Sequence, residues 1–307
     1  MVKSVVIYNH KGGVGKTMMS TNLAYLLATG GVDGAGEKKR VLLVDLDSQQ
    51  NCSKTFLKMK IPPGMGYAVP PKNAEYEEGD PDNGNWNGIS TSSDILLGRD
   101  FVYYKVDGLD NLEILPSEGR VESLNSNTIE KLNSDSPQLT KGVSELAAEF
   151  LADEEEAGEF DVILFDPPPS KTAICEGFLQ VCSHVLIPTE LEFDSVDGVK
   201  MLMNNIQIHN QQRSSALEVI GIIPNKITNP ITNKENHQLA MLSDPDSITA
   251  PYVSDLMIVK RGSFTPERKP EQVEKVFQYK KSGGALDVKA RDEIQSLYKL
   301  VLNAISE

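Results

Sequence analysis

Cysteine and long apolar runs are scarce in this sequence of 307 residues, and each shortage excludes a class of protein. The three cysteines, Cys52, Cys175 and Cys182, lack CxxC spacing, so neither a disulfide framework nor a zinc site is indicated. No stretch approaches the roughly 18–20 apolar residues that span a bilayer. A strand-like run begins within two residues of the start, which leaves no room for a signal peptide. We therefore expect a cytoplasmic, reduced protein with no stable membrane association.

Positive charge is also in short supply. The chain has 30 Lys and Arg against 44 Asp and Glu, a net charge of −14 at pH 7, which argues against indiscriminate binding of polyanions by the whole surface. Acidic residues gather in Glu75–Asp82 and Asp153–Glu156, whereas the segment from Asp255 to Leu300 has ten Lys and Arg against seven Asp and Glu. That segment fits either a basic face or a solvated surface of mixed charge.

Apolar runs alternate with helical patterns along the chain, which predicts repeated βα units and a mostly parallel sheet. The runs Val41–Val44 and Val162–Phe165 are apolar at every position, as central strands buried on both faces require. Helices are expected over Lys16–Thr29, where Gly30 ends the helix, and over about Asp287–Ile305. We predict a doubly wound α/β fold in a single domain over residues 1–307. The expected strands are Val2–Tyr8, Val41–Asp45, Leu112–Leu115, Val162–Phe165, His184–Ile187, Val219–Ile223 and Tyr252–Ile258.

The segment from Pro62 to Gly88 differs in composition from its surroundings. It contains five prolines and five glycines together with five acidic residues. Such a segment has little apolar surface to bury, so we expect a long surface insertion that is a loop or partly disordered.

A glycine-rich string, Lys11-Gly12-Gly13-Val14-Gly15-Lys16-Thr17, follows the apolar run Val5–Tyr8 and opens the first expected helix. The glycines let backbone N–H groups converge on an anion, and the helix N-terminus adds its positive dipole. Lys16 would reach the β- and γ-phosphates of a nucleotide, and the Thr17 hydroxyl would ligate Mg²⁺ directly. A turn that binds nothing is disfavoured by seven matched positions between a strand and a helix.

Carboxylates follow two of the expected strands. Asp45 and Asp47 come at the end of Val41–Asp45 and point the same way on an extended chain, and Asp166 follows Val162–Phe165. Ligands bind at this carboxyl edge in open α/β sheets. A lone aspartate at a strand end is more often a helix cap or turn former, but Asp166 ends a hydrophobic strand in a chain with a phosphate loop and fits a carboxylate that coordinates Mg²⁺ through water.

These strings together resemble the signature boxes of the ParA/MinD superfamily of deviant Walker A P-loop ATPases, and most closely the ParA-type partition and cargo-positioning ATPases. Lys11 in the KGGVGKT string is the deviant lysine. The string Asp45–Asn51 is similar to the family's DxDPQxN box, with Ser48 in place of proline, and Asp166–Ser170 is similar to its DxPPS box. A shorter match, Ile222–Lys226, resembles the segment that contacts adenine.

The resemblance implies roles for individual residues. Lys11 would reach across a dimer interface to the nucleotide of the partner subunit. Asp45 and Asp166 would hold Mg²⁺ through water, and Asp47 would orient the attacking water, so that Lys11, Lys16 and Asp47 form the catalytic set. The ATP-binding residues would be Lys11, Gly12, Gly13, Val14, Gly15, Lys16, Thr17, Met18 and Asn225.

The resemblance further implies an ATPase with ATP and Mg²⁺ as cofactors. Hydrolysis is expected to be slow and stimulated by a ParB-like partner protein. The ATP state would be a homodimer that binds double-stranded DNA non-specifically, associates with the nucleoid and positions a plasmid, a chromosome or a protein compartment. Three alternatives remain: a MinD-like membrane ATPase, a metabolic ligase of the same superfamily, and an ATP-dependent regulator that acts on a protein target without DNA.

A DNA-binding surface on an anionic protein requires cations that cluster, because affinity comes from neutralised phosphates and released counterions. The candidates lie around the last expected strand and before the final helix. They are Lys260, Arg261, Arg268, Lys269, Lys275, Lys280 and Lys281.

Overall fold

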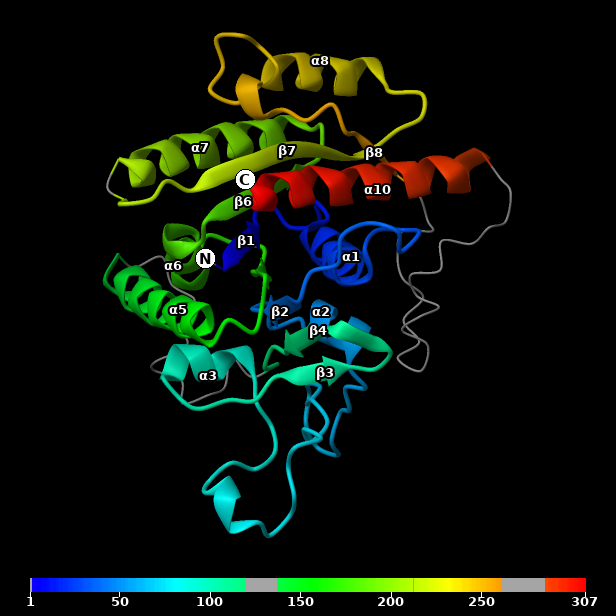
Figure 1. Ribbon diagram of the computed structural model, residues 1–307. Coiled ribbons are helices and arrows are strands. Elements are labelled where there is room, and N and C mark those ends of the chain that lie inside the picture. The colour runs from blue at the N-terminus through cyan, green and yellow to red at the C-terminus, as the bar shows by residue number, and fades with distance from the viewer. Residues whose placement is uncertain (1, 120–136, 212, 261–284) are drawn as a thin grey trace.

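The computed structural model describes residues 2–119, 137–211, 213–260 and 285–307 (Figure 1). Its eight-stranded sheet has the order β3-β4-β2-β5-β1-β6-β7-β8. Neighbouring strands pair in parallel, except that β3 and β4 are antiparallel. The strands are β1 Lys3–Ile7, β2 Val41–Asp45, β3 Tyr104–Val106, β4 Leu109–Leu115, β5 Val162–Asp166, β6 His184–Thr189, β7 Glu218–Ile227 and β8 Ile258–Val259.

Helices cover both faces of this sheet (Figure 1). They are α1 Lys16–Thr29, α2 Asn51–Phe56, α3 Ser92–Leu97, α5 Pro137–Ala157, α6 Ala173–Val181, α7 Phe193–Asn210, α8 Asn233–Leu242 and α10 Ala285–Ser306, with short 3₁₀ turns η1 Pro81–Asn83 and η2 Ala250–Tyr252. No helix within the described ranges is long and apolar enough to cross a membrane.

Successive side chains of each strand point to opposite faces of the sheet, and a hydrophobic core lies on each face. In β1, Val6 packs into the core formed with α5, α6 and α7. Val5 and Ile7 point the other way, into the core formed with α1, α2 and α10. Because successive side chains of a strand face opposite sides, central strands must be apolar throughout, and every residue of β2 and β5 is buried.

The order of connections reverses at β1, which pairs with β5 on one side and β6 on the other. Such a switch point leaves a crevice at the carboxyl ends of the strands, where ligands bind in open α/β folds. The β1–α1 loop lies there, and so do Asp45 and Asp166, which are register partners in the β2–β5 pair. The topology therefore gathers the three predicted boxes at one edge of the sheet.

Most predicted elements are confirmed, with three corrections. The bounds of α1 and β2 are those expected. The antiparallel edge strand β3 was not expected, because three residues carry too short a pattern to detect. The strand expected over Tyr252–Ile258 is wrong: η2 occupies its start, Val253 forms an isolated bridge with Ile222 of β7, and the strand β8 comprises Ile258–Val259. The final helix begins two residues earlier than expected and ends one later.

The segment from Pro62 to Gly88 forms a loop in which η1 is the regular element. Contacts between its own residues nevertheless hold this loop together. The Tyr76 and Trp86 rings meet edge to face with centroids 5.6 Å apart, and the Asn73 backbone N–H donates to the Gly88 carbonyl at 2.7 Å. The extended part of the insertion is the cyan lobe at the bottom of Figure 1.

The apolar stripe of the final helix packs into the core, as predicted. Ile294, Leu297, Val301 and Ile305 are buried against the α1 side of the sheet. Leu286, which the sequence placed on the same stripe, lies outside the residues whose side chains are described.

Candidate nucleotide-binding site

The loop between β1 and α1 has the backbone that its glycines predict. Gly13 and Gly15 have φ angles of 80° and 104°, a backbone region that residues other than glycine rarely adopt. Gly15 is the N-cap of α1, and its carbonyl accepts from the Met19 N–H at 3.0 Å. Gly12 and Gly13 are exposed and Val14 is buried. The loop therefore presents its backbone outward and uses one apolar side chain as an anchor.

Lys16 lies folded beneath the loop. Its Nζ donates to the carbonyls of Asn9 at 3.0 Å and Lys11 at 3.1 Å, and the residue is 6% exposed. Burial lowers the pKa of Lys16, while the nearby charge of Asp166 opposes that shift. A phosphate group at the loop would give this buried cation an anionic partner.

Lys11 leaves the loop in another direction. Its backbone N–H donates to Asn9 Oδ1 at 3.0 Å, and its Nζ forms an ion pair with Glu192 at 2.7 Å. Both side chains are partly exposed, at 32% and 53%. The deviant lysine is thus held by an acid of its own chain, at the start of α7.

Two buried carboxylates lie side by side at the ends of β2 and β5. Asp45 accepts from the Ser53 N–H at 2.8 Å and the Ser53 hydroxyl at 2.6 Å. Burial raises the pKa of Asp45 well above its ordinary value, and the adjacent charge of Asp166 raises it further. Burial also raises the pKa of Asp166, although hydrogen bonds to this carboxylate, including one with the Thr17 hydroxyl, oppose the rise.

This arrangement fits a hydrated magnesium ion. Mg²⁺ takes one or two carboxylates, hydroxyl oxygens, substrate phosphates and water, instead of a cage made only of protein groups. No cluster of three or more His, Cys, Asp or Glu residues that could hold a metal ion occurs in the described parts of the chain. The Thr17 hydroxyl and the carboxylates of Asp45 and Asp166 are the groups that would hold it, and a divalent cation would relieve the repulsion between the two carboxylates.

Asp47 lies within the same site. It is 7% exposed, it accepts from the Gln49 N–H at 2.9 Å, and its charge acts on Lys16. Its role beside the terminal phosphate of a nucleotide stays a prediction.

Asn225, expected at the adenine, contacts the phosphate loop instead. Its Nδ2 donates to the Val14 carbonyl at 2.7 Å, and a Cβ on Gly15 would lie 2.1 Å from the same nitrogen. The neighbouring Lys226 has a φ of 58° and forms an ion pair with Glu190 at 2.7 Å. In this structure Asn225 supports the loop, and its contact with adenine remains a prediction. Met18, also predicted at the nucleotide, is half-buried in the first turn of α1.

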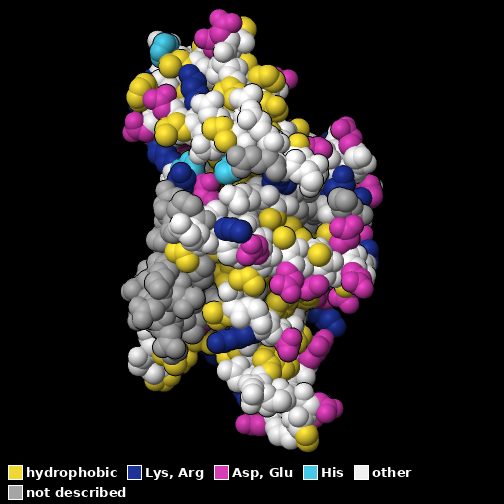
Figure 2. All heavy atoms as spheres, turned by 90° about the vertical axis from the view of Figure 1, so that its left-hand side faces the viewer, with side chains coloured by type: hydrophobic (Ala, Val, Ile, Leu, Met, Phe, Trp, Pro, Cys, Tyr) yellow, Lys and Arg dark blue, Asp and Glu magenta, His cyan; other side chains and the backbone are white. Residues whose placement is uncertain are grey.

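The candidate DNA-binding cations are mostly outside the described residues. Lys260 is exposed at the end of β8, where its N–H donates to the Ile227 carbonyl at 2.8 Å. On the face shown in Figure 2, the Lys and Arg side chains of the described residues stand singly among acidic ones. The candidates outside the described residues are Arg261, Arg268, Lys269, Lys275, Lys280 and Lys281.

Several residues that shape the site were not found from the sequence. Ser20 donates to Asp166 at 2.8 Å and Ser53 to Asp45, and a serine inside a helix carries no signal of such a distant partner. Glu190 and Glu192 could have been found, because they follow β6 at the same carboxyl edge as the other boxes. Asn9, 1% exposed, ties the loop to the Pro188 carbonyl at 2.7 Å.

The sheet order and this loop define a P-loop nucleoside triphosphatase of the deviant Walker A type. A family model described as an AAA domain matches residues 2–219, more than half of the chain, and the chain belongs to that family. It is a member of the ParA/MinD superfamily of ATPases, as the sequence predicted.

Known relatives agree with this assignment. The chromosome partitioning protein ParA of Caulobacter vibrioides is 26% identical over 231 residues, which are 72% of this chain and 68% of that protein. The ATP complex of a single-residue variant of Cyanothece McdA superposes with a TM-score of 0.69 at 15% identity, covering 98% of this chain and 96% of that one. The septum site-determining protein MinD of Pyrococcus horikoshii, in complex with Mg-ADP, gives a TM-score of 0.59 at 18% identity with the same coverage.

Proposed function

We propose that this chain, as one ATPase domain over residues 1–307, binds Mg-ATP at the β1–α1 loop and hydrolyses it slowly. The buried carboxylates of Asp45 and Asp166 support this proposal most directly, because burial raises the pKa of both and the charge of Asp166 raises the pKa of Asp45 further, a cost that a divalent cation would relieve. Mg²⁺, when bound, would neutralise the β- and γ-phosphates. Lys16 would bind the same phosphates, and Asp47 would orient the attacking water.

The ATP state would be a homodimer in which Lys11 of each subunit reaches the nucleotide of the other. The partial exposure of Lys11 supports this role, since a lysine that serves a partner subunit must be able to leave its own. Its bond to Glu192 would have to break first. The nucleotide then acts as a switch for assembly, because the lysine contributes charge at the partner's phosphates only when two sites face each other.

The ATP dimer would bind double-stranded DNA without sequence preference, associate with the nucleoid, and release DNA when a ParB-like partner stimulates hydrolysis. That cycle would position a plasmid, a chromosome or a protein compartment. The partition function in the name of the Caulobacter relative supports this proposal. Two copies of a weak cationic surface in one dimer would together bind far more tightly than either alone.

The decisive experiment measures binding of a labelled random-sequence duplex at low salt with ATP, with ADP and without nucleotide. We expect binding with ATP only, and none for Lys16→Ala, which removes the buried phosphate-directed cation. Asp47→Ala should keep ATP and accumulate as a DNA-bound dimer, because the phosphate contacts remain while water is not positioned. Absence of DNA binding by wild type and Asp47→Ala with ATP would overturn the DNA-binding part of the proposal.

A second candidate is an ATP-dependent regulator that acts on a protein or membrane target without DNA. The net charge of −14 favours it, because an anionic surface repels duplex DNA. Retained ATP-dependent dimerisation together with absent DNA binding would select this alternative.

A further inference from the structure

A buried tyrosine joins the segment before the phosphate loop to α6. Tyr8, which directly follows β1, is fully buried. Its hydroxyl lies 3.0 Å from His10 Nδ1 and donates to Glu176 Oε1 at 3.4 Å. The Tyr8 and His10 rings also meet edge to face, with centroids 5.1 Å apart. The hydroxyl therefore bridges the residue that precedes the phosphate loop and a carboxylate in the first turn of α6.

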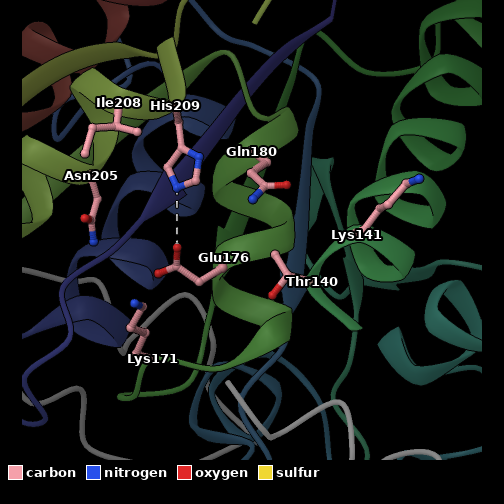
Figure 3. Close-up of a pocket in the computed structure, with 8 residues that line it drawn as sticks. All are labelled: Thr140, Lys141, Lys171, Glu176, Gln180, Asn205, Ile208 and His209. Carbon is pink, nitrogen blue, oxygen red and sulfur yellow. Dashed lines mark ion pairs between the residues drawn. The ribbon is translucent and has the colours of Figure 1, made fainter. Parts of the chain in front are cut away.

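Glu176 is placed to accept this hydrogen bond as a carboxylate. The residue is 6% exposed and lies in the first turn of α6, where the helix dipole favours negative charge. Its other oxygen, Oε2, lies 3.7 Å from His209 Nε2. Figure 3 shows the Glu176 carboxylate and the His209 ring directed toward each other between α6 and α7. These surroundings favour the ionised form of Glu176, which accepts hydrogen bonds and donates none.

The proton of the Tyr8 hydroxyl fixes the tautomer of His10. A tyrosine hydroxyl has one proton to donate, and in this structure that proton goes to Glu176. The contact between Tyr8 and His10 then requires that the imidazole Nδ1 carries a proton and donates it to the hydroxyl oxygen. The donors therefore run from His10 through Tyr8 to Glu176, and they hold the His10 ring in one tautomer and one orientation.

The carbonyls on either side of His10 hold the buried cation of the nucleotide site. Lys16 Nζ donates to the carbonyl of Asn9 at 3.0 Å and to that of Lys11 at 3.1 Å. Two of the three N–H groups of the ammonium are thereby used, so the two carbonyls determine where the third N–H points. Because His10 lies between these carbonyls and Tyr8 holds its side chain, a displacement of His10 would move both.

We propose that Tyr8 and His10 are positioning residues for phosphate binding. Their link to Glu176 fixes the segment before the loop, and that segment holds Lys16 ready for the β- and γ-phosphates. A preorganised cation loses less freedom when its ligand binds, which increases affinity. The general P-loop pattern has glycine at the position of His10, and glycine has no side chain through which the segment could be held. This inference rests on the nucleotide binding proposed above for the same loop.

The affinity of the full chain for Mg-ADP tests the positioning role. Tyr8→Phe keeps the ring and removes the hydroxyl, and it should raise the Kd about two- to tenfold, as expected for one lost hydrogen bond. Tyr298→Phe is the matched control. It removes another buried hydroxyl, which donates to the Glu37 carbonyl at 2.7 Å beyond the C-terminal end of α1, and it should leave the Kd unchanged. Equal Kd values for wild type and Tyr8→Phe would overturn the inference.

A double-mutant cycle separates positioning from a general loss of packing. His10→Ala removes the other end of the link, whereas His10→Asn keeps an amide N–H donor near the place of Nδ1. We expect His10→Ala to weaken Mg-ADP binding as Tyr8→Phe does, the double variant to bind no more weakly than the weaker single one, and His10→Asn to restore much of the affinity. Losses that simply multiply in the double variant would mean that the two residues act independently, which contradicts the inference.

Nitrogen NMR of the nucleotide-free protein tests the proton assignment. His10→Asn identifies the His10 signals among those of four histidines. At about pH 8, above the ordinary histidine pKa of about 6.5, wild type and Tyr298→Phe should carry the proton on Nδ1, and Tyr8→Phe should lose this preference. An Nδ1 without a proton in wild type would overturn the link. Wild type that binds no Mg-ADP would refute the proposed function together with this inference, whereas normal binding by wild type and an unchanged Kd in Tyr8→Phe would refute the positioning role alone.

Discussion

Among single residues, Lys11 is the one whose surroundings must change most for the proposed function. In this structure it pairs with Glu192 at 2.7 Å, and the same lysine lowers the pKa of Glu192 through that hydrogen bond. A dimer that uses both Lys11 side chains must break two such pairs. Glu192 would thereby set how readily ATP brings two chains together.

We therefore expect Glu192→Gln to strengthen ATP-dependent dimerisation. The gain should be between about twofold and thirtyfold, because each of two exposed ion pairs contributes about 0.2–1 kcal/mol. Lys11→Ala should weaken dimerisation and leave nucleotide binding by the monomer intact. Sedimentation with ATP measures both effects. Asp194→Asn, which removes a charge two residues away, is the control, and an equal gain there would mean that net charge alone is responsible.

The ionised carboxylate of Asp166 lowers the stability of the folded protein. Burial raises its pKa above the unfolded value, so the folded chain binds this proton more tightly than the unfolded chain does. The resulting loss of stability is absent below the ordinary aspartate pKa near 4 and grows as pH rises toward the folded-state pKa. At neutral pH the carboxylate therefore destabilises the nucleotide-free protein.

Asp166→Asn should raise the melting temperature of the nucleotide-free protein at pH 7 by a few degrees, as expected for roughly 1 kcal/mol or more. The gain should vanish near pH 4. Asp161→Asn is the matched control just before the other end of β5, because its pair with Arg40 lowers the pKa of Asp161 and gives that variant the opposite sign. A melting temperature of Asp166→Asn that is lowered at pH 7 would contradict the electrostatic account.

At the scale of elements, the sequence predicted best the strands that are buried on both faces of the sheet and the helix that is flanked by glycines. β2 and β5 were clear because all their residues are apolar up to the final aspartate, and α1 because glycines bound it at both ends. The strand β3 was not predicted, because it has three residues and pairs with another strand on one edge only. The contact of Asn225 with Val14 joins residues 211 positions apart, and neither segment carries a pattern that indicates the other.

The packing of α5 against α6 depends on one small residue. A Cβ on Gly177 would lie 2.5 Å from Val143 Cγ1, whereas nothing lies within 4 Å of a Cβ on Gly142. Gly142→Ala should stabilise the protein by up to about 1 kcal/mol, because alanine favours the helix interior. Gly177→Ala should destabilise it by about 1–3 kcal/mol, through overpacking. Thermal unfolding tests the opposite signs, and Val143→Ala should partly rescue Gly177→Ala; equal effects of the two glycine variants would contradict this packing.

At the scale of the whole molecule, net charge opposes both assemblies in the proposed cycle, but salt acts on them in different directions. Each chain carries −14, so two chains repel each other before their sites meet, and added salt screens that repulsion. Contacts buried in the interface are screened much less. DNA binding, by contrast, draws its affinity from released counterions and weakens steeply as salt rises.

Raising salt from about 50 to about 200 mM should therefore strengthen or preserve ATP-dependent dimerisation of Asp47→Ala while DNA binding falls by orders of magnitude. Sedimentation and duplex anisotropy on the same samples measure the two trends. Charge reversal at Lys260 with Arg261, or at Lys280 with Lys281, should lower DNA affinity and flatten its salt dependence, and spare ATP hydrolysis without DNA. Reversal at Lys58 with Lys299 is the control for the same change in net charge. If dimer and DNA affinity fall together with salt, loss of the dimer would explain the loss of DNA, and a cationic surface near the final strand would not be needed.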